Sequence, residues 1–88
     1  MSPFIPAVER IERARRLIQK ARDLKVPDGM GKSDLTYIAQ VKDILQQARD
    51  LVKFIPYTPT ATPELKNDVK KIFAEADQAN KEIFQLSH

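Results

Sequence analysis

Residues 38–55 read IAQVKDILQQARDLVKFI, and the spacing of their apolar side chains decides the fold. The apolar positions recur at alternating steps of three and four residues, at Ile38, Val41, Leu45, Ala48, Val52 and Ile55. Such spacing averages about 3.5 residues and places these side chains in one stripe along an α-helix, as in helical bundles. Ile44 and Leu51 widen the stripe, which is typical of a helix that contacts two neighbours.

The same spacing occurs on both sides of this stretch. Towards the C-terminus it comprises Leu65, Val69, Ile72, Ala76, Ala79, Ile83 and Leu86, widened by Phe73 and Phe84. Towards the N-terminus it comprises Val8, Ile11, Ala14, Ile18 and Ala21, with Leu17 and Leu24 beside them. No stretch alternates between apolar and polar residues with a period of two, so we expect no β-sheet.

Residues that begin and end helices agree with three helical segments. Pro6 suits the first turn of a helix, where its missing N–H does no harm. Ser33 is expected to be the N-cap of the second helix, with Asp34 just inside it, and Pro56 ends that helix. Thr62 is expected to cap the third helix.

We therefore expect helices at about 7–25, 34–55 and 63–86, joined by short linkers. The linkers are long enough to reverse the chain and too short for a distant crossover. The prediction is an all-α fold, an up-down-up three-helix bundle in which residues 1–88 form a single domain. A domain this small gains stability from a second copy, so we expect that it can self-associate.

Composition limits the classes of function. The chain has 88 residues, of which 42% are hydrophobic and 31% are charged, and it contains no cysteine. Disulfides and thiolate chemistry are thereby excluded, which favours a cytoplasmic protein. The start of the chain lacks the pattern of a secretory signal, and no apolar run approaches the ~20 residues of a membrane span, so we expect no membrane association.

Gly31-Lys32-Ser33 matches the end of the phosphate-binding loop of many nucleotide hydrolases. That loop also needs a glycine where this chain has Val26, and it follows a buried strand that the pattern here does not predict. Nucleotide hydrolysis is therefore not expected. A weaker hypothesis remains, in which free amides at a helix start and the Lys32 side chain bind a small anion at Gly31, Lys32 and Ser33.

No set of residues indicates catalysis. The single histidine is His88, the last residue, and the acidic residues fall outside the apolar stripes. We expect no catalytic residues, no metal site and no cofactor, and hence no enzyme.

Positive charge is concentrated in residues 7–25, which hold seven of the 15 Lys and Arg residues. Four of them share one flank of the expected helix and form a candidate basic binding face: Arg10, Arg13, Arg16 and Lys20. Such a face can bind nucleic acid or another polyanion. Glu9 and Glu12 precede Arg13 and Arg16 by four residues, however, which favours ion pairs within the helix.

Two other features have a structural and a functional interpretation. Residues 19–24 and 46–51 both read Gln-x-Ala-Arg-Asp-Leu, which indicates either paired sites or two helices that pack in the same way. Residues 56–59 read Pro-Tyr-Thr-Pro, which is either a docking peptide or a stiff connector between helices. We favour the structural interpretation of both.

These observations favour a non-enzymatic helical module that binds a protein partner or a second copy of itself. Binding of nucleic acid or polyanions through the first helix is the alternative hypothesis, and small-anion binding at Gly31, Lys32 and Ser33 is the second.

Overall fold

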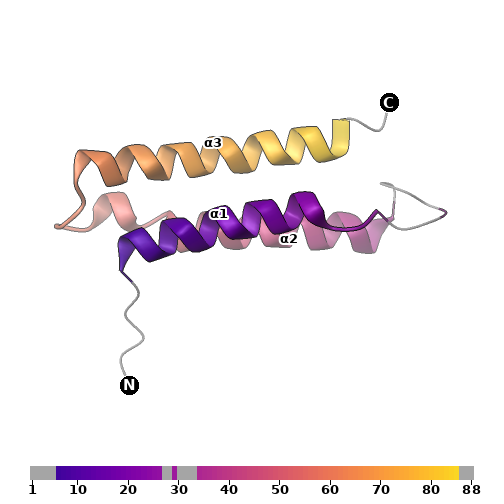
Figure 1. Ribbon diagram of the computed structural model, residues 1–88, viewed down its shortest axis with the longest axis horizontal. Coiled ribbons are helices and arrows are strands. Elements are labelled where there is room, and N and C mark those ends of the chain that lie inside the picture. Colours follow the sequence, from indigo (N-terminus) through magenta and orange to yellow (C-terminus); the bar gives the residue numbers. More distant parts are fainter. Residues whose placement is uncertain (1–5, 27–28, 30–33, 86–88) are drawn as a thin grey trace, which may run out of the picture.

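The computed structural model describes residues 6–26, 29 and 34–85. Its elements are α1 (Ala7–Asp23), α2 (Leu35–Val52), the short 3-10 helix η2 (Ile55–Tyr57) and α3 (Pro63–Gln85). The three long helices lie side by side, with α1 and α3 running in one direction and α2 in the other (Figure 1). No strand occurs in the described residues, which confirms the predicted all-α, up-down-up bundle.

α1 begins at Ala7 as predicted and ends at Asp23, two residues earlier than predicted, whereas α2 begins at Leu35, one residue later than predicted. Pro6 is the N-cap of α1 rather than part of its first turn, and its carbonyl accepts from the Arg10 N–H at 3.0 Å. Asp34 is the N-cap of α2, because its carboxylate accepts from the Tyr37 N–H at 2.9 Å. The prediction that Ser33 is the cap was wrong, since aspartate satisfies a free amide of the first turn equally well; Ser33 itself lies outside the described residues.

The connection between α2 and α3 is a structured turn. α2 ends at Val52 rather than at Ile55, and the chain passes directly into η2, in which Pro56 occupies the first turn. Thr62 then caps α3 as predicted, because its hydroxyl accepts from the Leu65 N–H at 3.1 Å. The turn sets the direction of the side chains on either side of Ile55.

The core runs along the whole length of the bundle and contains most residues of the three predicted stripes; Leu86 of the third stripe lies outside the described residues. Its buried members are Ile11, Ala14, Ile18, Ala21, Tyr37, Val41, Ile44, Leu45, Ala48, Val52, Ile55, Val69, Ile72, Ala76, Ala79 and Ile83. Fully buried alanines from all three helices allow the helix backbones to approach closely. The buried residues in the described part of the chain are all apolar or aromatic, and among them Tyr37 alone carries a side-chain hydroxyl.

Three of the described residues lie differently from the prediction, and one of them, Ile38, is half-buried and is not a member of the core. Val8 belongs to the predicted stripe but is exposed in the first turn of α1. Tyr37 was not in the predicted stripe but is buried, and its ring meets the ring of Phe84 edge-on, with centroids 6.4 Å apart. Ile44 and Leu51 follow Tyr37 at steps of seven, so these three side chains extend one flank of the same stripe.

Candidate interaction surface

One end of the bundle exposes large apolar side chains. Val8 in the first turn of α1 is 62% exposed, Phe54 just after α2 is 67% exposed, and Tyr57 in η2 is 84% exposed. Because α1 and α2 are antiparallel, the start of α1 and the end of α2 meet at this end (Figure 1). We call Val8, Phe54 and Tyr57 the end patch. Exposed apolar side chains that form one contiguous patch mark an interaction site more often than isolated apolar residues do.

A groove of about 250 Å³ adjoins the end patch. Its lining residues come from the start of α1, the end of α2 and the connector, and they are Ala7, Arg10, Asp50, Leu51, Phe54, Ile55, Thr58 and Thr60. The groove is therefore built from segments that only the fold brings together. Most of its lining is apolar, with charged groups at the sides, as in many binding sites.

The η2 turn explains why the aromatic residues are exposed. Ile55 is buried, and the turn is fixed by hydrogen bonds from the Tyr57 N–H to the Phe54 carbonyl at 3.1 Å and from the Thr58 hydroxyl to the Ile55 carbonyl at 2.8 Å. A tight turn that directs Ile55 inwards leaves its neighbours Phe54 and Tyr57 outside. Since residues 55–57 form a 3-10 helix rather than an extended polyproline helix, the structure supports the connector interpretation of this segment.

Both signs of charge line the groove. The Arg10 guanidinium reaches across from α1 and donates to the Leu51 carbonyl of α2 at 3.4 Å. The Asp50 carboxylate, next to Leu51 in the chain, accepts from the Gln46 amide at 2.9 Å and pairs with Lys53 at 3.1 Å. These two contacts, the Gln46 hydrogen bond first, lower the pKa of Asp50 below its usual value of 3.8, so this carboxylate is charged at neutral pH.

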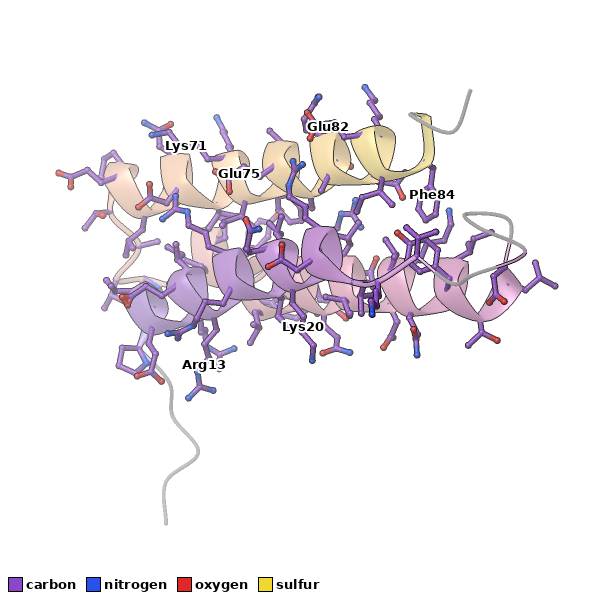
Figure 2. All side chains as sticks on the ribbon, turned by 45° about the vertical axis from the view of Figure 1, so that its right-hand side comes forward. Arg13, Lys20, Lys71, Glu75, Glu82 and Phe84 are labelled. Atoms are coloured by element: carbon purple, nitrogen blue, oxygen red, sulfur yellow. The ribbon has the colours of Figure 1, made fainter. Side chains whose placement is uncertain are left out.

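The structure divides the predicted basic face. Arg10 is half-buried and directed towards α2, whereas Arg13, Arg16 and Lys20 are exposed on α1. Arg13 and Lys20 project from the side of α1 that faces away from α3 (Figure 2). Arg13 pairs with Glu9 at 2.9 Å as predicted. Among the described residues no ion pair is formed by Arg16 or Lys20, so the expected pair of Arg16 with Glu12 is absent.

Other cations of α1 and α2 form exposed ion pairs with acids of α3, which were not predicted from the sequence. Arg15 of α1 lies 3.9 Å from the carboxylates of both Asp68 and Glu75 on α3. Further along the same two helices Arg22 pairs with Glu82. The acids Asp68, Glu75 and Glu82 are spaced by seven residues, as are the two arginines, so the pairs form a charge ladder beside the core. This spacing was visible in the sequence, but it has meaning only once α1 and α3 are known to be parallel neighbours.

The internal repeat has a structural use in both copies. Gln19 donates to Asp23 and Gln46 donates to Asp50, each at 2.9 Å, and Ala21 and Ala48 are both fully buried. The arginine of each copy also reaches α3: Arg22 pairs with Glu82, as above, and Arg49 pairs with Asp77 at 2.9 Å. The repeat therefore describes two helices that pack against the third in the same way, which supports the packing interpretation.

Three further predictions concern an anion site, metal binding and membrane association. The candidate anion site, Gly31, Lys32 and Ser33, lies outside the described residues. Within the described part of the chain no group of three or more His, Cys, Asp or Glu residues is arranged to hold a metal ion. The described helices also include none with both the length and the apolar character that crossing a bilayer requires.

We compared the chain with known proteins in three ways. No protein-family model matches it. No curated protein and no solved structure shows significant similarity to it.

Proposed function

We propose that this protein is a non-enzymatic interaction module whose contact surface is the end patch and its groove. The observation that carries the proposal is the exposure of Phe54 and Tyr57, two aromatic residues held outside the core by the rigid η2 turn. Aromatic side chains supply much of the binding energy in protein interfaces and have few rotatable bonds to immobilise. A preformed aromatic surface beside a groove thus binds a partner at low entropic cost.

The contrast with the rest of the surface supports this choice. The sides of the bundle carry charged residues, many of which already pair with one another along α1, α2 and α3. The end patch instead presents two exposed aromatic side chains, with the Lys53 ammonium 5.2 Å from the centre of the Phe54 ring. The opposite end also exposes apolar side chains, Val26 and Leu35, but neither of them is aromatic. Covering such surface is favourable by roughly 25 cal/mol per Å² of apolar area.

Binding of nucleic acid or a polyanion through α1 is supported less well. Four of the basic residues of α1 already have partners within the fold: Arg10, Arg13, Arg15 and Arg22. Only Arg16 and Lys20 of the predicted face combine exposure with freedom from ion pairs in the described part of the chain. Two cations release few counterions, so any such binding would be weak and only mildly dependent on salt.

The proposed cytoplasmic location rests on the lack of cysteine alone.

Site-specific photo-crosslinking tests the proposal. A photoreactive amino acid at position 57 lies in the end patch, and one at position 35 is the matched control, because Leu35 is 80% exposed at the opposite end of the bundle. We expect crosslinked protein adducts in cells of the source organism from position 57 and few or none from position 35. Equal adducts from both positions, or adducts that disappear after nuclease treatment, would contradict the proposal.

A further inference from the structure

We infer that the surface formed by α2 and α3 binds the phosphate backbone of double-stranded DNA. This surface lies along the side of the bundle, so the inference goes beyond the proposed function and does not rest on the end patch. We call it the lysine face and define it by four exposed lysines, one on α2 and three on α3. They are Lys42, Lys66, Lys70 and Lys81.

Two contacts between α2 and α3 show that these lysines share one face of the bundle. The Lys42 ammonium of α2 lies 5.6 Å from the centre of the Phe84 ring of α3, and Arg49 of α2 pairs with Asp77 of α3 at 2.9 Å. Phe84 and Asp77 therefore mark the side of α3 that adjoins α2. The three lysines of α3 stand three, four, seven or eleven residues from Asp77 or Phe84, intervals that place side chains on the same side of a helix.

The charges of the lysine face are available to a ligand. None of its four lysines forms an ion pair with another residue that the structure describes, and the contact of Lys42 with an aromatic ring leaves its charge in place. Asp77, beside the lysines of α3, is already paired with Arg49. Asp50 of α2 is already paired with Lys53. The four lysines therefore remain positively charged without an acidic partner in the described part of the chain.

The opposite side of α3 has a different arrangement of charge. There Arg15 of α1 lies 3.9 Å from the carboxylates of Asp68 and Glu75. Arg22 of α1 pairs with Glu82. Charges on the side of α3 that adjoins α1 thus largely cancel one another. Positive charge that is free to meet a ligand is concentrated on the side that adjoins α2.

The length of the lysine face suits a phosphate backbone. Lys66 and Lys81 are 15 residues apart on α3, which is about 22 Å at the rise of an α-helix. A DNA duplex carries one negative charge per ~1.7 Å of its axis, so a rigid row of this length faces many phosphates at once. Lysine binds phosphate as a point charge, so it needs no particular orientation of the phosphate group.

A hollow on the same face offers further hydrogen-bond donors. Its volume is about 260 Å³, and it is lined by Lys42, Leu45, Gln46, Arg49 and Asn80. The half-buried Asn80 amide forms no hydrogen bond with the rest of the described chain, so both of its N–H groups are free to donate. A phosphate in this hollow would meet the Asn80 amide and the Lys42 ammonium together.

The chemistry of the face favours a DNA duplex over other anionic partners. Single strands are commonly held by bases stacked on aromatic rings, but Phe73 and Phe84 of α3 are partly buried against the core. A membrane surface binds helices that also insert apolar side chains, and α3 has no large exposed apolar residue in its described length. Recognition of RNA duplexes uses contacts to 2′-hydroxyl groups, whereas this face consists mainly of ammonium groups. Because lysines contact phosphates rather than bases, we expect binding without sequence preference.

Fluorescence anisotropy with a labelled DNA duplex of about 20 base pairs, which is longer than the face, tests the inference. We expect wild type to bind with a dissociation constant on the order of 10⁻⁵ M at about 50 mM salt. Four phosphate contacts predict a slope of about −3.6 in the logarithm of the binding constant against the logarithm of the salt concentration. The affinity should therefore fall by about 100-fold between about 50 and about 200 mM salt.

Lysine-to-glutamine variants locate the contact. The double variant Lys66→Gln, Lys70→Gln removes two of the four phosphate contacts, so it should weaken binding by about tenfold and halve the slope. The double variant Lys20→Gln, Lys71→Gln is the matched control, because it removes the same charge from exposed lysines outside the face. Lys71 stands four residues before Glu75, on the acidic side of α3, and Lys20 lies on α1 (Figure 2). The control should bind nearly as tightly as wild type.

Three results would overturn the inference. The first is a wild-type protein that does not bind the duplex at about 100 μM and about 50 mM salt. The second is a control variant that loses as much affinity as the variant of the face, since binding would then follow net charge alone. The third is tighter binding to a single strand, to an RNA duplex or to vesicles of phosphatidylcholine and phosphatidylserine than to the DNA duplex.

Discussion

The middle of the bundle and its α2–η2 end use apolar residues in opposite ways. In the middle, small and medium side chains such as Ala48, Val41 and Ile72 are completely buried, and interhelical ion pairs lie beside them. At the end, Phe54 and Tyr57 are larger and are largely exposed. The helices pack closely where alanine separates them. Phe54 and Tyr57 lie largely outside this packing, whereas Tyr37, Phe73 and Phe84 lie in or against the core.

This difference separates stability from binding. Residues in the middle have no access to a partner, so changes there should alter the free energy of unfolding. Residues of the end patch have few contacts to lose on substitution, so changes there should alter binding and leave stability nearly unchanged. The following predictions test this separation, starting with the largest expected effect.

The largest effect is expected from Ile72→Ala in the middle of α3. Ile72 is fully buried, so the substitution removes apolar contacts and leaves a cavity, which should lower the free energy of unfolding by about 2–5 kcal/mol. Tyr57→Ala is the control at the end, with an expected change of at most about 0.5 kcal/mol. Urea unfolding followed by circular dichroism measures both, and a similar loss in the two variants would contradict the separation.

A smaller loss is expected from Ala48→Leu in α2. Ala48 is fully buried where the helices approach closely, so the larger side chain forces them apart, at a cost of about 1–3 kcal/mol. Ala39→Leu makes the same change at an exposed position of the same helix and should have almost no effect. If Ala48→Leu is as stable as Ala39→Leu, the bundle is less tightly packed than described.

The cap of α3 should contribute less again. Thr62→Ala removes the acceptor for the Leu65 N–H and should lower the free energy of unfolding by about 1 kcal/mol. Thr62→Ser keeps the hydroxyl and should retain most of the stability. Both are measured by urea unfolding, and equal losses in the two variants would show that the hydroxyl is not what matters.

The smallest effect is expected from pH and the charge ladder. Hydrogen bonds from Gln78 and then Arg22 lower the pKa of Glu82 below its usual value of 4.5. The folded state therefore binds this proton less readily than the unfolded state does, so the stabilisation is complete above about pH 4.5 and is lost as the pH falls through the lowered pKa. Thermal melts should show Glu82→Gln less stable than wild type near neutral pH, with the difference disappearing at about pH 2. A difference that grows towards low pH would contradict this assignment.

Most of the fold could be predicted from the sequence because three apolar stripes with one period have few ways to be buried together. The cap at Thr62 was predictable because a hydroxyl before proline at a helix start has a local role. The cap of α2 was placed at Ser33 instead of Asp34, since both residue types serve as caps and the sequence does not rank neighbouring positions.

The candidate surface could not be predicted in the same way. Phe54 and Tyr57 flank Ile55, which the spacing placed correctly in the core, but their exposure depends on where α2 stops and how η2 turns. The division of the basic face also depends on neighbours, because Arg10 is directed towards α2 while Arg13 remains on the outside. The exposure and direction of these side chains depend on contacts between helices. The spacing of residues along one helix carries no information about those contacts.

The charge ladder between α1 and α3 has a further consequence for how this chain can be altered. Its rungs, Asp68, Glu75 and Glu82, repeat with the same interval as the apolar stripe beside them. Seven residues added to each of the three helices at the same level would therefore lengthen the rod by about 10 Å without disturbing either pattern. The length of the bundle could therefore be changed by engineering while the structure of its α2–η2 end stays the same.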